Sequence, residues 1–328
     1  MNKNKINWVA VLTMMFLFGM IAFVTNLAAP IGVIWKQAPG VEGSNFWGMM
    51  GNMMNFLAYA FMGIPAGKLI TKIGYKKTTL IGVGVGLIGV FVQFLSGKIG
   101  VGSTLAGLPA NFFVYLLGAF ICGFSVCILN TVVNPMLNLL GGGGNRGNQL
   151  VQIGGTFVSL LGTLTPMLVG ALVGSVTKDT VITDVNLVLY IAMGVFAATF
   201  VILTFIPFVE PEQEKNNISV KSLFEYRHLV FGVVAIFFYV GVEVGIPGTM
   251  NFFLTDTLGT ANAATTAGFV AGTYWLLMLV GRFVSSLISG KVSSRAQLAA
   301  TSGAAIVLVI LAMFTTDVPA SMPVFTGS

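Results

Sequence analysis

Nine apolar stretches, each long enough to cross a lipid bilayer, constrain the fold of this chain more than any other feature. They lie at residues 7–35, 46–71, 77–97, 107–140, 148–176, 184–208, 228–256, 262–289 and 296–315. At about 1.5 Å of rise per residue, a helix needs about 20 apolar residues to span the hydrocarbon core. Only 8% of the residues are charged, against roughly 25% in a soluble domain. The chain is therefore predicted to be an all-α integral membrane protein.

The distribution of lysine and arginine predicts the orientation of these stretches in the membrane. With the N-terminus in the cytoplasm, the cytoplasmic side holds twelve basic residues: Lys3, Lys5, Lys68, Lys72, Lys76, Lys77, Arg146, Lys215, Lys221, Arg227, Lys291 and Arg295. The opposite side holds only Lys36, Lys98 and Lys178. This excess follows the positive-inside rule and predicts a multi-pass protein of the inner membrane with a cytoplasmic N-terminus. Because the basic residues are scattered among loops, the net charge of +6 indicates no nucleic-acid partner.

One extended hydrophilic segment, residues 209–227, divides the apolar stretches into two groups. Residues 1–208 hold six stretches and are predicted to form an N-terminal membrane half, whereas residues 228–328 hold three. Transporters with two halves are built from repeats of three helices that pair into six-helix units. The simplest interpretation is a bundle with nine transmembrane helices present of an expected twelve, joined by a cytoplasmic linker. A natural nine-helix protein is the alternative.

Glu243 is the only acidic residue in the middle of an apolar stretch. An ionisable group at the bilayer centre costs at least about 2.5 kcal/mol on insertion scales and marks a functional site by default. Its neighbours Gly241, Gly245, Pro247 and Gly248 are expected to weaken or break the helix. Irregular backbone at membrane depth survives only where protein or a water-filled cavity satisfies the freed groups. Glu243 is therefore expected to face a cavity.

Enzyme chemistry finds little support in this sequence. His228 is the only histidine and sits at a loop–helix junction, while Asp256 lies near the outer end of its stretch. No cluster of metal-ligating residues is present in the sequence, so neither catalytic residues nor a metal site are predicted. The G-x-G-x-x-G pattern at 84–89 lies inside an apolar stretch rather than after a strand. It indicates close helix packing, not a dinucleotide cofactor.

The apolar stretches also contain seven neutral amides, and Glu243 is expected to be the only charge in these stretches. The amides are Asn26, Asn52, Asn55, Asn130, Asn134, Gln152 and Asn251. Tyr274 and Trp275 add aromatic faces. A buried amide without a partner costs about 1–3 kcal/mol, so each one bridges helices or lines a wet cavity. Amides both donate to and accept from hydroxyl groups, so the set indicates a cavity for a neutral polyhydroxylated solute.

Five segments carry a resemblance to a known family. They are P-A-G-K-L-I-T-K-I-G-Y-K-K (Pro65–Lys77), N-T-V-V-N-P-M-L-N-L-L-G (Asn130–Gly141), R-G-N-Q-L-V-Q (Arg146–Gln152), F-Y-V-G-V-E-V-G (Phe238–Gly245) and T-A-G-F-V-A-G-T-Y-W…G-R-F (Thr266–Phe283). In this order they resemble the major facilitator superfamily, and most closely its fucose:proton symporter and glucose/galactose transporter branch. The resemblance implies alternating access, with a sugar site between two membrane halves.

The chain departs from that branch at the positions tied to proton coupling. The symporter has a glutamate where this chain has Asn130, and an aspartate that falls near Ala29. Gln152 matches a glutamine of the symporter, while a nearby asparagine is replaced by Gly155. Both coupling acids of the relative are therefore missing here. By elimination, Glu243 becomes the candidate for coupling to H⁺ or Na⁺, and no other cofactor is expected.

The leading hypothesis is a secondary transporter of a neutral sugar, a hexose or deoxyhexose. Asn26, Asn130, Gln152, Asn251 and Trp275 are its predicted substrate-binding residues, with the sugar and the lipid bilayer as partners. Two alternatives remain at this point. One is a membrane-embedded binding or sensor protein without net transport, and the other is an exporter of amphipathic compounds, which would suit the many methionine and phenylalanine residues.

Overall fold

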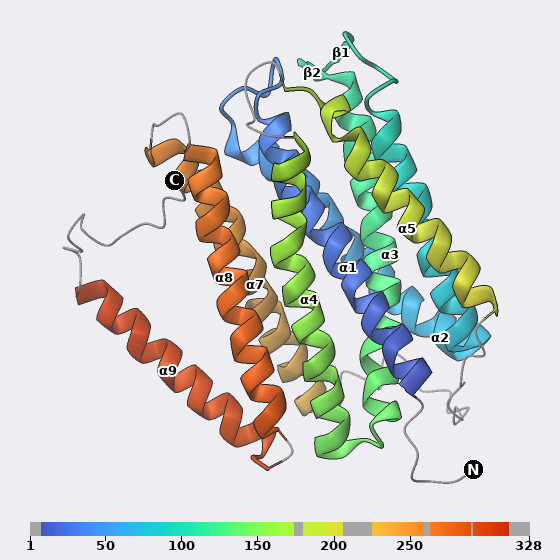
Figure 1. Cartoon of the computed structure of the whole chain (residues 1–328), viewed down its shortest axis with the longest axis vertical. Coiled ribbons are helices and arrows are strands. Elements are labelled where there is room, and N and C mark those ends of the chain that lie inside the picture. The colour runs from blue at the N-terminus through green and yellow to red at the C-terminus, as the bar shows by residue number, and fades with distance from the viewer. Residues whose placement is uncertain (1–7, 174–179, 206–224, 259–262, 290, 315–328) are drawn as a thin grey trace.

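Long helices, nearly all of them apolar, make up the protein (Figure 1). The structure is a computed structural model and describes residues 8–173, 180–205, 225–258, 263–289 and 291–314. The helices are α1 (Trp8–Trp35), α2 (Asn45–Leu95), α3 (Ala110–Leu140), α4 (Gly144–Val173), α5 (Asn186–Phe205), α7 (Arg227–Leu258), α8 (Ala263–Ile288) and α9 (Ser294–Phe314). A short 3-10 helix, η1 (Ile182–Val185), precedes α5. The strands β1 (Thr104–Leu105) and β2 (Leu108–Pro109) form an antiparallel hairpin before α3.

The predicted all-α membrane class is confirmed, with one difference in how the stretches are divided. Within the described residues, seven helices are long and apolar enough to cross a membrane. One of them, α2, contains two predicted stretches, 46–71 and 77–97, joined at Gly74. Gly74 has a φ of 85°, a left-handed conformation that favours glycine because other residues carry a Cβ atom. The chain therefore changes direction there without leaving a long loop.

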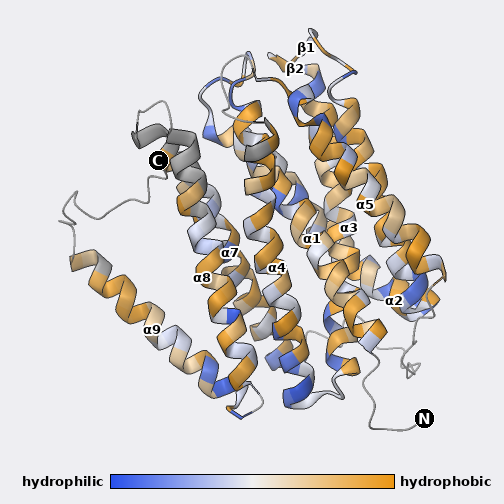
Figure 2. Ribbon diagram, in the orientation of Figure 1, coloured by the Kyte–Doolittle hydropathy of each residue, from blue (hydrophilic) through white to orange (hydrophobic). Residues whose placement is uncertain are grey.

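The tightest packing lies in the N-terminal part of the chain. In the most apolar 18-residue segment of α1 and of α3, 67% of the residues are buried inside the protein. In the most apolar segments of α7 and α9, no residue is buried. Figure 2 shows hydrophobic residues along α8 and α9, and apolar side chains such as Phe237 of α7, Leu277 of α8 and Leu308 of α9 are exposed. In a membrane, lipid or further protein covers such side chains. The helices α7 and α8 join the bundle through α8, which packs along α4 (Figure 1).

Glycines allow α2 and α3 to approach each other closely. A Cβ atom on Gly89 would lie 2.7 Å from the backbone nitrogen of Cys122, and one on Gly123 would collide with the carbonyl of Asn55. Gly86 likewise faces the side chains of Phe196 and Ser125. The glycine pattern at 84–89 thus serves helix packing, as the sequence indicated.

Gly123→Ala is expected to force α2 and α3 apart and to lower stability by about 1–3 kcal/mol, the usual cost of overpacking. Thermal unfolding of the purified protein in detergent would measure this loss. Gly194→Ala is the matched control because no heavy atom lies within 4 Å of an added Cβ there, and alanine favours the helix. Equal unfolding midpoints for the two variants would contradict the packing role of Gly123.

Candidate functional site

Helix α4 forms the seam between the two predicted halves of the protein. It packs against α1 on one side and α8 on the other (Figure 1). Glycine is frequent along it, and three of its glycines each receive a side chain from a neighbouring helix. Gly154 lies against the ring of Phe18 from α1, whereas Gly155 and Gly162 face α8. The absence of side chains at these positions lets large groups of α1 and α8 reach the α4 backbone.

At Gly162 three helices bring polar and aromatic groups together. A Cβ atom on this residue would lie 3.4 Å from Nδ2 of Asn26 and 3.3 Å from Cε3 of Trp275. Asn26 donates a hydrogen bond of 2.8 Å to the carbonyl of Ala22, while its own amide oxygen has no hydrogen-bond partner among the described residues. The Trp275 indole is half-buried and stands almost perpendicular to Tyr274, with an angle of 85° between the rings. Two predicted substrate-binding residues, Asn26 and Trp275, therefore meet at one point.

Two turns along α4 from Gly162, Arg282 makes a hydrogen bond across the same seam and an ion pair within the second predicted half. Arg282 of α8 pairs with Glu243 of α7, and its other terminal nitrogen donates a bond of 2.9 Å to the carbonyl of Gly155. The hydroxyl of Tyr239 lies 3.5 Å from the guanidinium. The side chains of Arg282 and Glu243 are 19% and 14% exposed. Arg282 thus joins three helices through charge-assisted hydrogen bonds, which are stronger than neutral ones.

Two expectations about this region are wrong. Glu243 is not the only charge in the apolar stretches, because Arg282 lies inside the eighth one; the G-R-F sequence at 281–283 was the available signal. The helix around Glu243 is also not broken, since α7 runs without interruption through Pro247. Proline has no backbone N–H, so the carbonyl of residue 243 loses its usual helical donor even though the helix continues.

Asn130 lies in a different cluster, between α2 and α3. Its Nδ2 donates a 2.8 Å hydrogen bond to the hydroxyl of Tyr59. Asn134 donates to both the backbone carbonyl and the side-chain oxygen of Asn130, at 3.0 and 3.4 Å. The structure therefore satisfies the Asn130 amide within the protein and groups it with Tyr59 rather than with Trp275.

The two remaining predicted binding residues differ in how well they are defined. Gln152 is half-buried on α4, three residues before Gly155. No hydrogen bond of its side-chain amide is found in the part of the chain that the structure describes. Asn251 belongs to α7, but its side chain lies outside what the structure describes. Substrate binding by Gln152 and by Asn251 therefore stays a prediction.

Polar contacts also close the seam near the end that carries the basic loops. Gln149 donates a 3.0 Å hydrogen bond to the carbonyl of Ser286, and Asn148 donates one of 3.3 Å to the hydroxyl of Ser294. Asn138 of α3 donates a 3.1 Å bond to Asn148. These contacts tie α3 and α4 to α8 and α9. The two predicted halves therefore touch at this end of the bundle.

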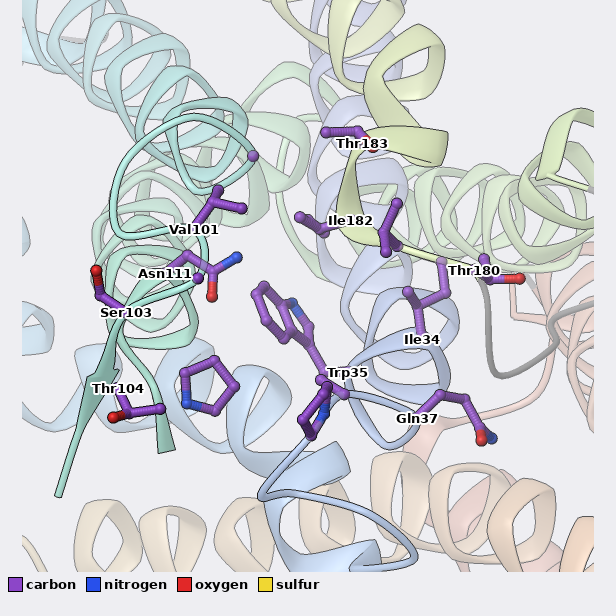
Figure 3. Close-up of a pocket in the computed structure, with 16 residues that line it drawn as sticks. Ile34, Trp35, Gln37, Val101, Ser103, Thr104, Asn111, Thr180, Ile182 and Thr183 are labelled. Carbon is purple, nitrogen blue, oxygen red and sulfur yellow. The ribbon is translucent and has the colours of Figure 1, made fainter. Parts of the chain in front are cut away.

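A separate hollow of about 450 Å³ lies at the opposite end of the molecule, beside the β1–β2 hairpin and η1. Figure 3 shows Trp35 in its wall, together with Asn111 and Thr183. Trp35 lies nine residues after Asn26 on α1, about 13 Å along the helix axis. Its ring packs on Phe112, with a centroid distance of 5.0 Å. The hollow is therefore distinct from the contacts at Gly162.

A helical bundle whose helices are long and apolar enough to cross a membrane defines the class of the protein, a multi-pass integral membrane protein. Comparison with known proteins gives the family. The sequence model of the Major Facilitator Superfamily matches residues 9–327, and the chain belongs to that family. The predicted transporter family, rather than an enzyme family, is thereby confirmed.

Several relatives carry transporter names. The chain is 30% identical to a glucose/galactose transporter of Brucella abortus over 271 residues, which cover 80% of this chain and 62% of the relative. It is 33% identical to a putative glucose/galactose transporter of Helicobacter pylori over 278 residues, covering 79% and 63%. The chain thus spans less than two thirds of the length of these relatives.

A solved structure supports the same fold. The crystal structure of the Escherichia coli fucose:proton symporter aligns with a TM-score of 0.65 over 89% of this chain and 74% of that protein. The sequence identity is 18%, so this likeness concerns the fold alone. It confirms the architecture that the five sequence segments predicted.

Proposed function

We propose that the protein is a secondary transporter that moves a neutral sugar across the inner membrane by alternating access. The observation that carries this proposal is the meeting of Asn26 and Trp275 at Gly162, on the seam between the predicted halves. An amide offers a donor and an acceptor to sugar hydroxyls. An indole offers a large apolar face, and the N–H group at its edge can remain hydrated. The names of the relatives, glucose/galactose transporter and L-fucose-proton symporter, support a sugar as the solute.

Glu243 and Arg282 provide the proposed coupling to a cation, H⁺ or Na⁺. A ligand changes a conformational equilibrium only through its different affinity for the two states. Protonation of Glu243, or a sodium ion beside it, would remove the counter-ion of Arg282. Arg282 also bonds to the carbonyl of Gly155 on α4, so the same event would alter a contact between the two predicted halves. Ion binding would thus be linked to the side of the membrane on which the sugar site is open, as coupled transport requires.

The proposed organisation follows the sequence. Residues 1–208 form the N-terminal half, 228–328 contribute helices of the second half, and 209–227 link them on the cytoplasmic side. Most of this linker lies outside the described residues. The contacts of Gln149 and Asn148 support a state closed on the cytoplasmic side, because they lie beside the predicted cytoplasmic residues Arg146 and Lys291. Figure 2 shows hydrophilic residues at this end of α4 and α9.

Equilibrium binding to the purified chain, measured by calorimetry with a panel of hexoses, deoxyhexoses and lipophilic cations, tests the proposal. We expect a hexose or deoxyhexose to bind, and Trp275→Ala to weaken its affinity roughly tenfold through loss of the ring contact. Trp8→Ala is the control, because Trp8 lies at the start of α1 and is 60% exposed. Binding of lipophilic cations alone would favour the exporter. Sugar binding without uptake into proteoliposomes would favour the sensor.

A further inference from the structure

The contact between α4 and α8 has a regular register. Gly162 faces Trp275 and Gly155 faces Arg282. The two glycines are seven residues apart on α4, and their two partners are seven residues apart on α8. Seven residues correspond to about 10 Å, or two turns, along a helix. Because the two helices run antiparallel, the Arg282–Gly155 hydrogen bond at one end of this segment holds Trp275 opposite Gly162 at the other. Gly162 therefore has a fixed partner rather than an incidental neighbour.

Groups of the proposed sugar site lie close beside Gly162. An added Cβ atom would be 3.3 and 3.4 Å from two carbons of the Trp275 ring and 3.4 Å from the Asn26 amide nitrogen. The 3.3 Å distance is tighter than ordinary van der Waals contact and the other two lie at its lower limit, so a methyl group would displace the indole by a few tenths of an ångström and press on the Asn26 amide. One substitution at this position would thus move both binding groups without replacing either.

Two prolines add backbone acceptors at the same level. Pro166 follows Gly162 by four residues in α4, and Pro30 follows Asn26 by four residues in α1. A proline has no N–H, so it cannot donate the usual helical hydrogen bond to the carbonyl four residues earlier. The carbonyls of Gly162 and Asn26 therefore lack their i+4 donor. Within a membrane such groups need another partner, and a hydroxyl group is a suitable donor.

We propose that Gly162 is a specificity-determining residue, which sets the size of sugar that fits between the Trp275 ring and α1. The inference rests on the proposed sugar transport and deepens it. Glycine at this position lets the indole lie against the α4 backbone beside Asn26. A side chain on α4 would push the indole away from this position and against the bound sugar. Sugars with more substituents would then lose affinity first.

The test compares the affinities of the purified chain for a hexose and for a pentose, which lacks the exocyclic CH₂OH group. Gly162→Ala is expected to weaken hexose binding about tenfold or more, the usual effect of one methyl group in a tight site. Pentose binding should fall much less. In a Trp275→Ala background the same substitution should have little effect, because the displaced ring is gone. Gly194→Ala, with open space around the added methyl group, should change neither affinity.

Each remaining outcome decides against the inference. An equal loss of both affinities together with a lower unfolding midpoint would make Gly162 a packing residue. Unchanged affinities would show that the indole does not bound the site. If the unsubstituted chain bound no sugar, the proposed function would fail as well. Binding measurements on the unsubstituted chain alone identify that case. Should Gly162→Ala fail to fold, Trp275→Phe replaces it: a smaller ring should favour hexose over pentose by several-fold, and an unchanged ratio overturns the inference.

Discussion

Arg282→Gln is expected to destabilise the protein more than any other single substitution in the seam and to abolish uptake. The change leaves the Glu243 carboxylate, which is only 14% exposed, without its counter-ion. Removing one partner of a buried ion pair costs about 3–5 kcal/mol. The substitution also removes the bond of 2.9 Å to the carbonyl of Gly155. Thermal unfolding in detergent and sugar uptake into proteoliposomes measure the two effects.

A double variant separates the ion pair from the other contacts of Arg282. Glu243→Gln combined with Arg282→Gln removes both charges, so the stability should recover by a large part of the loss. Uptake should not recover, because the link from α8 to Gly155 is still missing. Arg295→Gln is the control, since Arg295 is exposed at the start of α9. Additive losses in the double variant would show that Arg282 does not stabilise Glu243.

The helices could be predicted from the sequence because membrane-spanning length and apolar composition are local properties. The boundary between the stretches 46–71 and 77–97 is confirmed, because the helix α2 is kinked at Gly74, which has a φ of 85°. The uninterrupted course of α7 was not predicted. Glycine and proline lower helix propensity, but a helix at membrane depth satisfies its own backbone groups, and this outweighs the local preference.

The candidate site could be predicted only in part, because it depends on helix register. Asn26 and Trp275 were identified as a buried amide and an aromatic group, yet they are 249 positions apart in the sequence. No local pattern states that both lie against Gly162. Asn130 illustrates the limit: its amide is a plausible sugar ligand by type, but the hydroxyl of Tyr59 already accepts its hydrogen bond.

Arg282 could have been found from the sequence. An arginine inside an apolar stretch carries the same insertion cost as a glutamate, and charges at that depth usually have a partner of opposite sign. Pairing Glu243 with the nearest basic residue in a neighbouring apolar stretch leads to Arg282. What remains unpredictable is the third contact, the carbonyl of Gly155, because it requires α4 to lie beside α8.

Glu243→Gln is expected to abolish sugar accumulation driven by a pH or sodium gradient while sparing sugar exchange across the same membrane. Glutamine keeps the shape of the side chain and its hydrogen-bonding capacity, but it can neither gain a proton nor hold a cation by charge. Because glutamine resembles the neutral, protonated carboxyl group, the sugar-loaded carrier can still alternate, so exchange continues. Proteoliposomes containing radiolabelled sugar, with and without an imposed gradient, measure both activities. Glu42→Gln is the control, because Glu42 is exposed in the loop before α2.

The same experiment distinguishes coupling from a purely structural role of Glu243. If the carboxylate only holds α7 to α8 through Arg282, its replacement weakens that contact in every state of the cycle. Accumulation and exchange then fall together, and the unfolding midpoint falls with them. If accumulation is unchanged, Glu243 has no part in coupling. Selective loss of accumulation is expected only when the proton or sodium ion acts at Glu243 itself, because only then does the ion change the Arg282 contact with α4.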